Sequence, residues 1–271
     1  MSDAPIRNGD LARVASRSLH LQAAMTPERM QGLGFGFALL PALRRLYPAP
    51  EACGAALRRH LSYFATHPVL AGYVLGAAAR LEERRAAGEP IEDEAIDATK
   101  RALASPLAAL GDPLFWATLR PLAGLLGVIA IAVLPPPAAG DPDLRVLLCP
   151  FVLLLAYNAV ALPFRLRGVA RGYADADRPD ALLRSLPLRE WTGFLERAGA
   201  FAFGAFLAFA AVDLDVAAIV RGAAPRGRLL ALAPLVVGGV IAAAGCRARP
   251  GRSVETALLA LGAAVLLAIP I

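Results

Sequence analysis

One short cluster in the sequence combines residue types that can bind a sugar: Gly111-Asp112-Pro113, followed by Phe115 and Trp116. A carboxylate accepts hydrogen bonds from hydroxyls, and an indole offers an apolar face to a sugar ring. Asp112 and Trp116 are one helical turn apart, and an acidic residue at membrane depth is usually functional. The alternative interpretation is that Asp112 caps a helix that begins at Pro113, with Trp116 as an interfacial anchor.

Two further polar positions also have open interpretations. Glu28 and Arg29 follow Pro27 at the expected start of a helix, for which Thr26 is a plausible N-cap. Glu28 either supports this cap or makes a polar contact to a partner protein or to sugar hydroxyls. Asn158 lies in an otherwise apolar segment, where an amide usually bonds another helix, and it is also a candidate substrate-binding residue.

The histidines raise the hypothesis of a metal site, which their context does not favour. His60 and His67 are seven residues apart, so on a continuous helix they would share a face and could bind a metal together with Cys53. Thr66 and Pro68 predict that the helix ends between them, because the residue before proline is biased away from helical geometry. We therefore expect two hydrogen-bonded structural histidines near the membrane surface and no metal.

Other catalytic patterns fail on spacing or are missing. Gly32, Gly34 and Gly36 superficially match a dinucleotide loop, but the fingerprint needs a preceding strand and a different third spacing. Small residues in an apolar helix instead predict close helix packing. The sequence has no Ser-His-Asp arrangement, Walker loop or H-E-x-x-H motif. We therefore expect neither a catalytic residue nor a cofactor.

The elements that position these residues belong to a membrane protein. Hydrophobic residues make up 57% of the chain and charged residues 18%, with a mean hydropathy of +0.55, beyond the usual composition of soluble domains. The net charge of +6 does not indicate nucleic-acid binding, because the arginines flank apolar segments. The three cysteines are far apart and suggest no disulfide framework.

Before residue 121 the apolar segments are short. A spanning helix needs about 20 apolar residues, so these segments predict buried, re-entrant or interfacial helices: Leu33–Leu43, Val69–Ala79 and Leu103–Leu110. Between the last two, the charged stretches Glu82–Arg85 and Glu92–Lys100 predict two helices. A turn at Gly88 and Pro90 separates them, and the second has an acidic first turn.

After residue 121 the sequence predicts about five spanning helices: Leu122–Leu134 with a possible extension back to Leu114, Val146–Pro163, Ala198–Val212, Leu229–Cys246 and Val254–Ile271. We expect an all-α polytopic integral membrane protein with a polar tail at 1–18, a motif-bearing region at 19–121 and a transmembrane region at 122–271. The distribution of arginines predicts a cytoplasmic N-terminus and an outside C-terminus.

Three ordered motif blocks resemble the IID membrane subunit of the mannose/fructose/sorbose family of sugar phosphotransferase systems. The blocks are PERMQGLGFGFALLPALRRLYP, RRHLSYFATHP and PLAALGDPLFWATLRP. The resemblance is strong over about residues 17–125. The motif residues that it marks as partner-binding or structural are Arg29, Gln31, Arg44, Arg45, His60, Thr66, His67, Gly111 and Pro113.

The resemblance implies a complex in the bacterial cytoplasmic membrane. The chain would pair with a IIC subunit to bind and translocate a hexose, and several such IIC–IID pairs would assemble. A soluble IIB subunit would phosphorylate the sugar with phosphate received through IIA, so no phosphorylated residue is expected on this chain. The alternative is a regulatory or receptor protein that keeps the same scaffold without transporting sugar.

Overall fold

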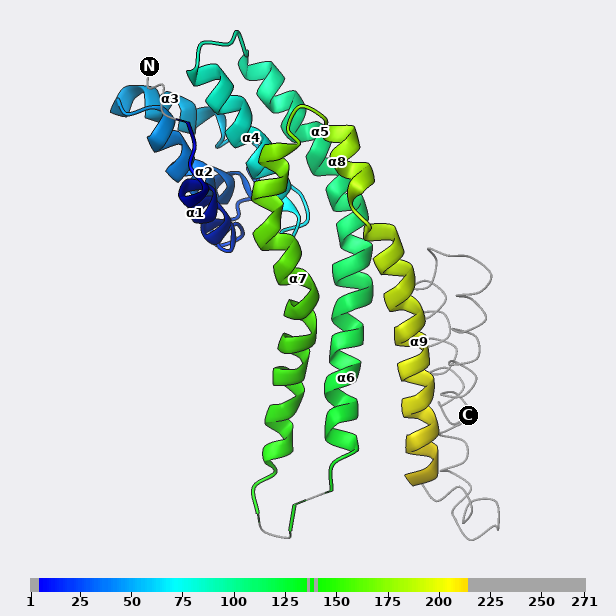
Figure 1. Ribbon diagram of the computed structural model, residues 1–271. Helices are drawn as coiled ribbons and strands as arrows, with labels where there is room; N and C mark the ends of the chain where they lie inside the picture. The colour runs from blue at the N-terminus through cyan, green and yellow to red at the C-terminus, as the bar shows by residue number, and fades with distance from the viewer. Residues whose placement is uncertain (1–4, 136, 139–140, 214–271) are drawn as a thin grey trace. The chain divides into compact units, whose positions relative to one another are not determined.

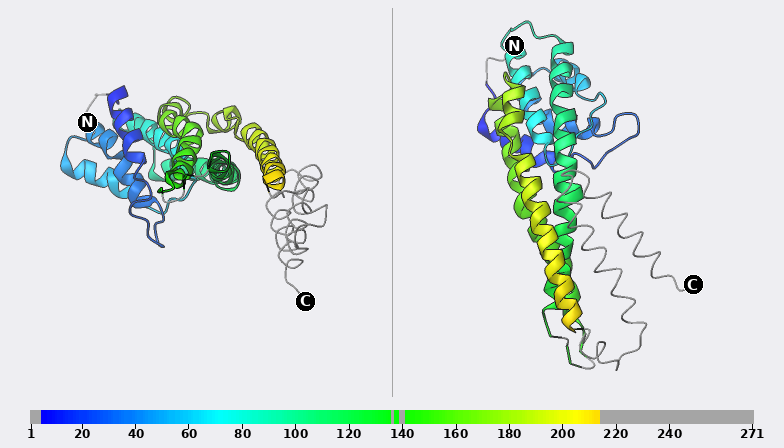
Figure 2. Two further views of the ribbon diagram at one scale, coloured as in Figure 1. Left: turned by 90° about the horizontal axis from the view of Figure 1, so that it is seen from below. Right: turned by 90° about the vertical axis from the view of Figure 1, so that its right-hand side faces the viewer.

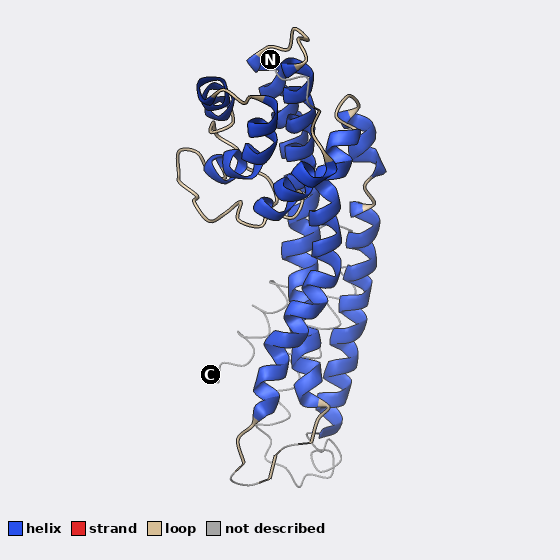
Figure 3. Ribbon diagram, turned by 60° about the vertical axis from the view of Figure 1, so that its left-hand side comes forward, coloured by secondary structure: helices blue, strands red, loops and turns tan. Residues whose placement is uncertain are grey.

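The computed structural model describes residues 5–135, 137–138 and 141–213, and these residues form helices and loops without a strand (Figure 3). The all-α prediction is therefore confirmed for this part of the chain. The chain divides into two compact units. We call Met1–Trp116 with Tyr157–Arg189 the first unit, and Ala117–Ala156 with Glu190–Ile271 the second unit.

Most of the short helices belong to the first unit (Figure 1). They are α1 (Asn8–Ser18), α2 (Gly32–Leu46), α3 (Pro50–Arg59), α4 (Ala71–Ala86), α5 (Asp93–Gly111) and α8 (Pro179–Ser185), with the later part of α7 (Leu148–Ala174). The segment expected as a polar tail contains α1, which buries Leu11 and Val14 and packs against α2. The polar residues of α1 alternate with apolar ones at helical spacing, so one face can be buried.

Helix α4 forms the core of the first unit. Its residues 71–79 are all buried, as expected of a helix that is apolar on every side, which confirms the buried-helix interpretation of Val69–Ala79. Glycines allow α4 and α7 to cross closely: a Cβ on Gly76 would lie 2.0 Å from Val169 O, and one on Gly172 would lie 2.0 Å from Tyr73 O.

The predicted turn after α4 is confirmed. Gly88 has a φ of 101°, a left-handed conformation that glycine adopts without strain. Helix α5 then begins at Asp93, with Asp93 and Glu94 in its first turn, where carboxylates interact favourably with the helix dipole.

The expected break at Gly111-Asp112-Pro113 is not present. Helix α5, the π-helix η1 (Asp112–Leu119) and α6 (Arg120–Ala132) form one helix of 40 residues. Pro113 has no N–H group, so it cannot make the usual helical hydrogen bond, and the wider π-type turn keeps the chain helical. The prediction that Asp112 caps a new helix is therefore wrong, as is that of a separate segment at Leu103–Leu110.

The second unit contains α6, the first part of α7, η2 (Leu144–Leu147) and most of α9 (Leu188–Asp213). Figures 1 and 2 show α6 beside the first part of α7, where a Cβ on Gly127 would lie 2.7 Å from Cys149 O. Phe151, Leu154 and Leu155 are exposed, as on a lipid-facing surface.

Two described helices are long and apolar enough to cross a membrane, judged by length and composition: Asp93–Ala132 and Leu144–Ala174. The predicted span Ala198–Val212 lies within α9. Leu229–Cys246 and Val254–Ile271 lie outside the described residues. The count of about five spans and the orientation of the termini therefore stay predictions.

Candidate functional site

The first two motif blocks and the third block as far as Trp116 lie in the first unit. Gln31 joins the first block to the second. Its side-chain amide donates to Thr66 O (2.8 Å) and accepts from Thr66 N–H (3.1 Å). The Thr66 hydroxyl donates to Ala104 O on α5 (2.8 Å). Gln31 and Thr66 are buried, so these bonds fix the two blocks and α5 to one another with little competition from water.

The segment before α2 is a turn and not the start of a helix. Thr26 and Met30 exchange backbone hydrogen bonds of 2.7 and 3.3 Å, and Gln31 N–H donates to Phe64 O (2.9 Å). Met30 has a φ of 49°, which is uncommon for a residue other than glycine. The prediction that Thr26 caps a helix is therefore wrong, because the backbone pairs with itself and with the second block. Glu28 lies exposed on this turn.

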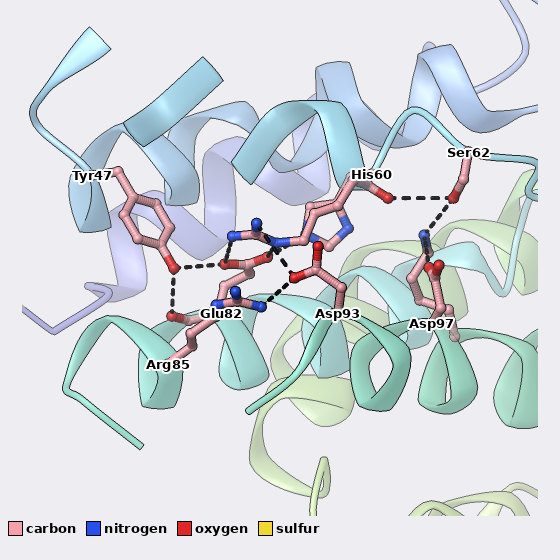
Figure 4. A network of polar contacts seen from close by, with 9 residues as sticks. Tyr47, His60, Ser62, Glu82, Arg85, Asp93 and Asp97 are labelled. Atoms are coloured by element: carbon pink, nitrogen blue, oxygen red, sulfur yellow. Dashed lines mark hydrogen bonds and ion pairs between the residues drawn. The ribbon is translucent and has the colours of Figure 1, made fainter. Parts of the chain in front are cut away.

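A buried carboxylate forms the centre of a second cluster (Figure 4). Glu82 on α4 is fully buried and accepts hydrogen bonds from Tyr47 Oη (2.7 Å), His60 Nε2 (2.7 Å) and Arg59 (2.8 and 3.1 Å). Tyr47 follows α2, whereas Arg59 and His60 lie at the end of α3. One carboxylate therefore holds the ends of two helices against α4.

The protonation states in this cluster follow from its geometry. Burial alone would raise the pKa of Glu82, but the hydrogen bonds from His60, Arg59 and Tyr47 outweigh burial and lower that pKa to about 2. Burial lowers the pKa of His60, more than Glu82 raises it. A neutral His60 then donates from Nε2 to Glu82, and its Nδ1 is buried without a hydrogen-bond partner.

The folded protein should lose stability at low pH, when the Glu82 carboxylate becomes protonated. The pKa of Glu82 is lowered from 4.5 to about 2, so its contribution to folding is complete above about pH 4.5 and is lost as the pH falls towards 2. Thermal unfolding in detergent at about pH 6 and about pH 3 should show a fall in Tm that is smaller in Glu82→Gln. Equal falls in both proteins would contradict this assignment.

Lys100 links α5 to the same region. Its ammonium group is buried, donates to Ser62 Oγ (3.2 Å) and Asp97 Oδ1 (3.0 Å), and lies 5.3 Å from the centre of the Phe35 ring, within cation–π range. Phe35 also contacts Phe64 of the second block, at 4.4 Å between ring centres. The first block, the second block and α5 therefore share one aromatic centre.

The third block packs on the end of the second. His67 is buried and stacks on Phe115 at 4.9 Å, and Trp116 meets it edge to face at 5.9 Å. A Cβ on Gly111 would lie 2.7 Å from His67 Cβ, so glycine is needed for this approach. Burial and the positive charge of Arg165 lower the pKa of His67 to about 4, which keeps the ring neutral.

The substrate candidates from the sequence are only partly brought together. Trp116, which is 51% exposed, contacts His67, and Asp112 lies exposed one turn earlier on the same helix. Glu28 lies on the separate turn before α2, and Asn158 is exposed on α7. Of the paired arginines at the end of α2, Arg44 is exposed and Arg45 half-buried.

Sequence reasoning missed Glu82, which it placed in a charged amphipathic stretch. The signal was its helical phase: Glu82 follows Ala78 by four residues and Leu75 by seven, so all three lie on one face of α4. Among the described residues, no group of three or more His, Cys, Asp or Glu side chains could hold a metal ion.

These features define a helical protein with two helices long enough to span a membrane and motif blocks that form a packed polar and aromatic centre. The profile of the PTS system mannose/fructose/sorbose family IID component matches residues 5–223. The chain belongs to this family.

Individual relatives agree with this family. The chain is 42% identical over 170 residues to the PTS system mannose-specific EIID component of Escherichia coli (strain K12), covering 62% of this chain and 56% of that protein. It is 39% identical over 173 residues to the PTS system sorbose-specific EIID component of Klebsiella pneumoniae, covering 64% and 59%. The matched region thus spans little more than half of either relative.

A solved structure shares the fold. It is described as the cryoEM structure of mannose transporter ManYZ and microcin E492 (MceA) complex, and a chain in it matches with a TM-score of 0.57 at 39% identity. The match covers 75% of this chain and 71% of that one.

Proposed function

We propose that this chain is the IID subunit of a hexose permease of the phosphotransferase system. The observation that carries the proposal is the packing of the three family motif blocks against one another: Gln31 bonds Thr66 between the first and second blocks, and His67 of the second block stacks on Phe115 of the third. The chain works with a IIC subunit to translocate the sugar. A IIB subunit phosphorylates the sugar with phosphate received through IIA, and this chain carries no phosphate itself.

The proposed setting is the bacterial cytoplasmic membrane, with a cytoplasmic N-terminus, an outside C-terminus and an assembly of several IIC–IID pairs. The apolar helices Asp93–Ala132 and Leu144–Ala174 support membrane insertion. Seven arginines in Phe164–Arg197 support a cytoplasmic position for that stretch.

Within this complex, we assign sugar contacts to Asp112 and Trp116. Asp112 accepts hydrogen bonds from hydroxyls, and Trp116 offers its exposed indole to the ring. Glu28 and Asn158 are the secondary candidates, because both are polar and exposed.

Uptake of labelled hexose in cells without other hexose permeases tests the proposal. The cells would contain the soluble phosphotransferase proteins and express the cognate IIC subunit alone, this chain alone, or both. Uptake should require both subunits. Equal uptake with IIC alone would contradict a transport role for this chain.

The second prediction concerns Asp112. Asp112→Asn should raise the apparent KM for hexose about 10-fold or more, because hydrogen bonds to a charged group contribute about 1.5–3 kcal/mol. Asp180→Asn, which changes an exposed aspartate on α8, is the matched control and should leave KM unchanged. Normal KM in Asp112→Asn would remove Asp112 from the site.

A further inference from the structure

Three buried N–H donors in the described part of the first unit have no hydrogen-bond partner. In the described part of the chain, the buried side-chain atoms without one are Arg45 Nε, His60 Nδ1, His67 Nε2 and Arg165 Nε. The His60 atom is an acceptor, because Nε2 donates to Glu82. Arg45, His67 and Arg165 each leave a buried donor unused, and a buried unpaired donor destabilises a protein. His67 and Arg165 differ from Arg45 because they lie near one another, close enough for the charge of Arg165 to act on His67.

The tautomer of His67 follows from its other nitrogen. Val69 N–H donates to His67 Nδ1 at 3.3 Å, so Nδ1 is the acceptor and Nε2 carries the proton. His67 is 1% exposed. The unpartnered atom, Nε2, therefore carries a proton and belongs to a ring that packs against Phe115 and Trp116.

Arg165 lies close to the same place. Its charge contributes to the low pKa of His67, and the neighbouring Phe164 packs edge to face on Phe115 at 5.8 Å. One terminal nitrogen of Arg165 donates to Ser18 O (3.0 Å) at the end of α1, where helix carbonyls favour a cation. No carboxylate forms an ion pair with Arg165 among the described residues.

We propose that His67 and Arg165 are the hydrogen-bond donors of the hexose-binding subsite that Asp112 and Trp116 border. This inference rests on the proposed function and adds residues to the same site. The His67 and Arg165 N–H groups need acceptors, which the oxygens of a neutral sugar supply. The Asp112 carboxylate takes the hydroxyl protons, and Trp116 covers the apolar face of the ring.

Access to the donors requires one side chain to move. Both N–H groups are covered in this conformation. Trp116 is the neighbour best placed to move, because it meets His67 edge to face and is 51% exposed. Hexose binding therefore changes the environment of Trp116.

Equilibrium binding of labelled mannose and fructose to the purified IIC–IID complex tests the inference, without phosphoenolpyruvate or IIB. His67→Leu and Arg165→Met should each weaken binding about 10-fold or more, because each removes a buried hydrogen bond to the ligand. His67→Gln keeps an N–H donor and should stay within about 3-fold of the parent. Exposed residues provide the matched controls, His20→Leu and Arg167→Met, which should bind normally.

A second readout separates binding from folding. The chain has two tryptophans, so in a Trp191→Phe variant Trp116 is the only tryptophan of this chain that fluoresces. A complex that also carries Trp116→Phe gives the fluorescence of the IIC partner, which is subtracted. Hexose should change the Trp116 emission in the parent and not in His67→Leu. The His67→Leu complex should stay assembled, with a Tm within a few degrees of the parent's.

The outcomes are distinguishable. A parent complex that binds hexose, with unchanged affinity in His67→Leu and Arg165→Met, would overturn the inference and leave the proposed function standing. Competition by inorganic phosphate would show an anion site and also overturn it. A parent complex that binds no hexose would overturn both.

Discussion

Replacing Glu82 with leucine is expected to destabilise the protein by about 3–5 kcal/mol, because removing one partner leaves a buried charge without compensation. Arg59, whose side chain is 15% exposed, would lose its carboxylate, and the fully buried His60 would lose its acceptor. The ends of α2 and α3 would lose their attachment to α4. Thermal unfolding of the detergent-solubilised protein measures the loss as a fall in Tm.

Glu89→Leu is the matched control for this experiment. Glu89 forms an ion pair with Arg84 at the surface, and exposed pairs contribute about 0–1 kcal/mol. The Tm of Glu89→Leu should therefore stay close to that of the parent. A Glu82→Leu protein as stable as Glu89→Leu would show that the buried cluster does not hold the helices together.

Gly76→Ala is expected to destabilise the first unit by about 3 kcal/mol, at the upper end of the usual 1–3 kcal/mol for overpacking. The new Cβ would lie 2.0 Å from Val169 O and 2.5 Å from Tyr173 N. These are backbone atoms, so relief requires α4 and α7 to move apart. Loss of folded, detergent-soluble protein or a fall in Tm would report the effect.

Gly9→Ala controls for helix propensity. Gly9 lies in α1, and a Cβ there would meet nothing within 4 Å. Alanine is favoured over glycine within helices by up to about 1 kcal/mol, so this variant should be as stable as the parent or more so. If Gly76→Ala behaved like Gly9→Ala, the close crossing of α4 and α7 would be wrong.

The sequence predicted features that depend on local patterns. The role of Gly32 and Gly34 in close packing is confirmed: a Cβ on Gly32 would lie 2.2 Å from Ser62 O, and one on Gly34 would lie 1.9 Å from Leu21 O. The prediction that His60 and His67 do not share one continuous helix is also confirmed, although α3 already ends at Arg59, before His60. The small residue type of the glycines and the position of Pro68 are visible in the sequence, whereas the partners that the glycines approach are not.

The sequence failed where distant segments decide the local structure. Thr26 has the residue type of an N-cap, but Met30 and Gln31 bond instead to Thr26 and to Phe64 of the second block. Asp112 precedes a proline, yet the helix continues through it as a π-helix. Competition between local preference and tertiary packing produced both errors.

The candidate site also combines residues that the sequence indicates with residues that only the folded structure brings together. The sequence selected Asp112 and Trp116 by residue type, and the proposed subsite adds His67 and Arg165, which lie far from each other along the chain. Burial without a hydrogen-bond partner is a property of the folded chain, so sequence patterns alone could not reveal it.

Phosphoenolpyruvate-dependent phosphorylation of labelled mannose, fructose, glucose and N-acetylglucosamine tests the central claim most directly. Membranes containing the cognate IIC subunit, with and without this chain, would be supplemented with the soluble phosphotransferase proteins. Sugar phosphate should form only when both membrane subunits are present, and the sugar that becomes phosphorylated is the substrate. If IIC and this chain co-purify but no hexose is phosphorylated, the permease role is contradicted.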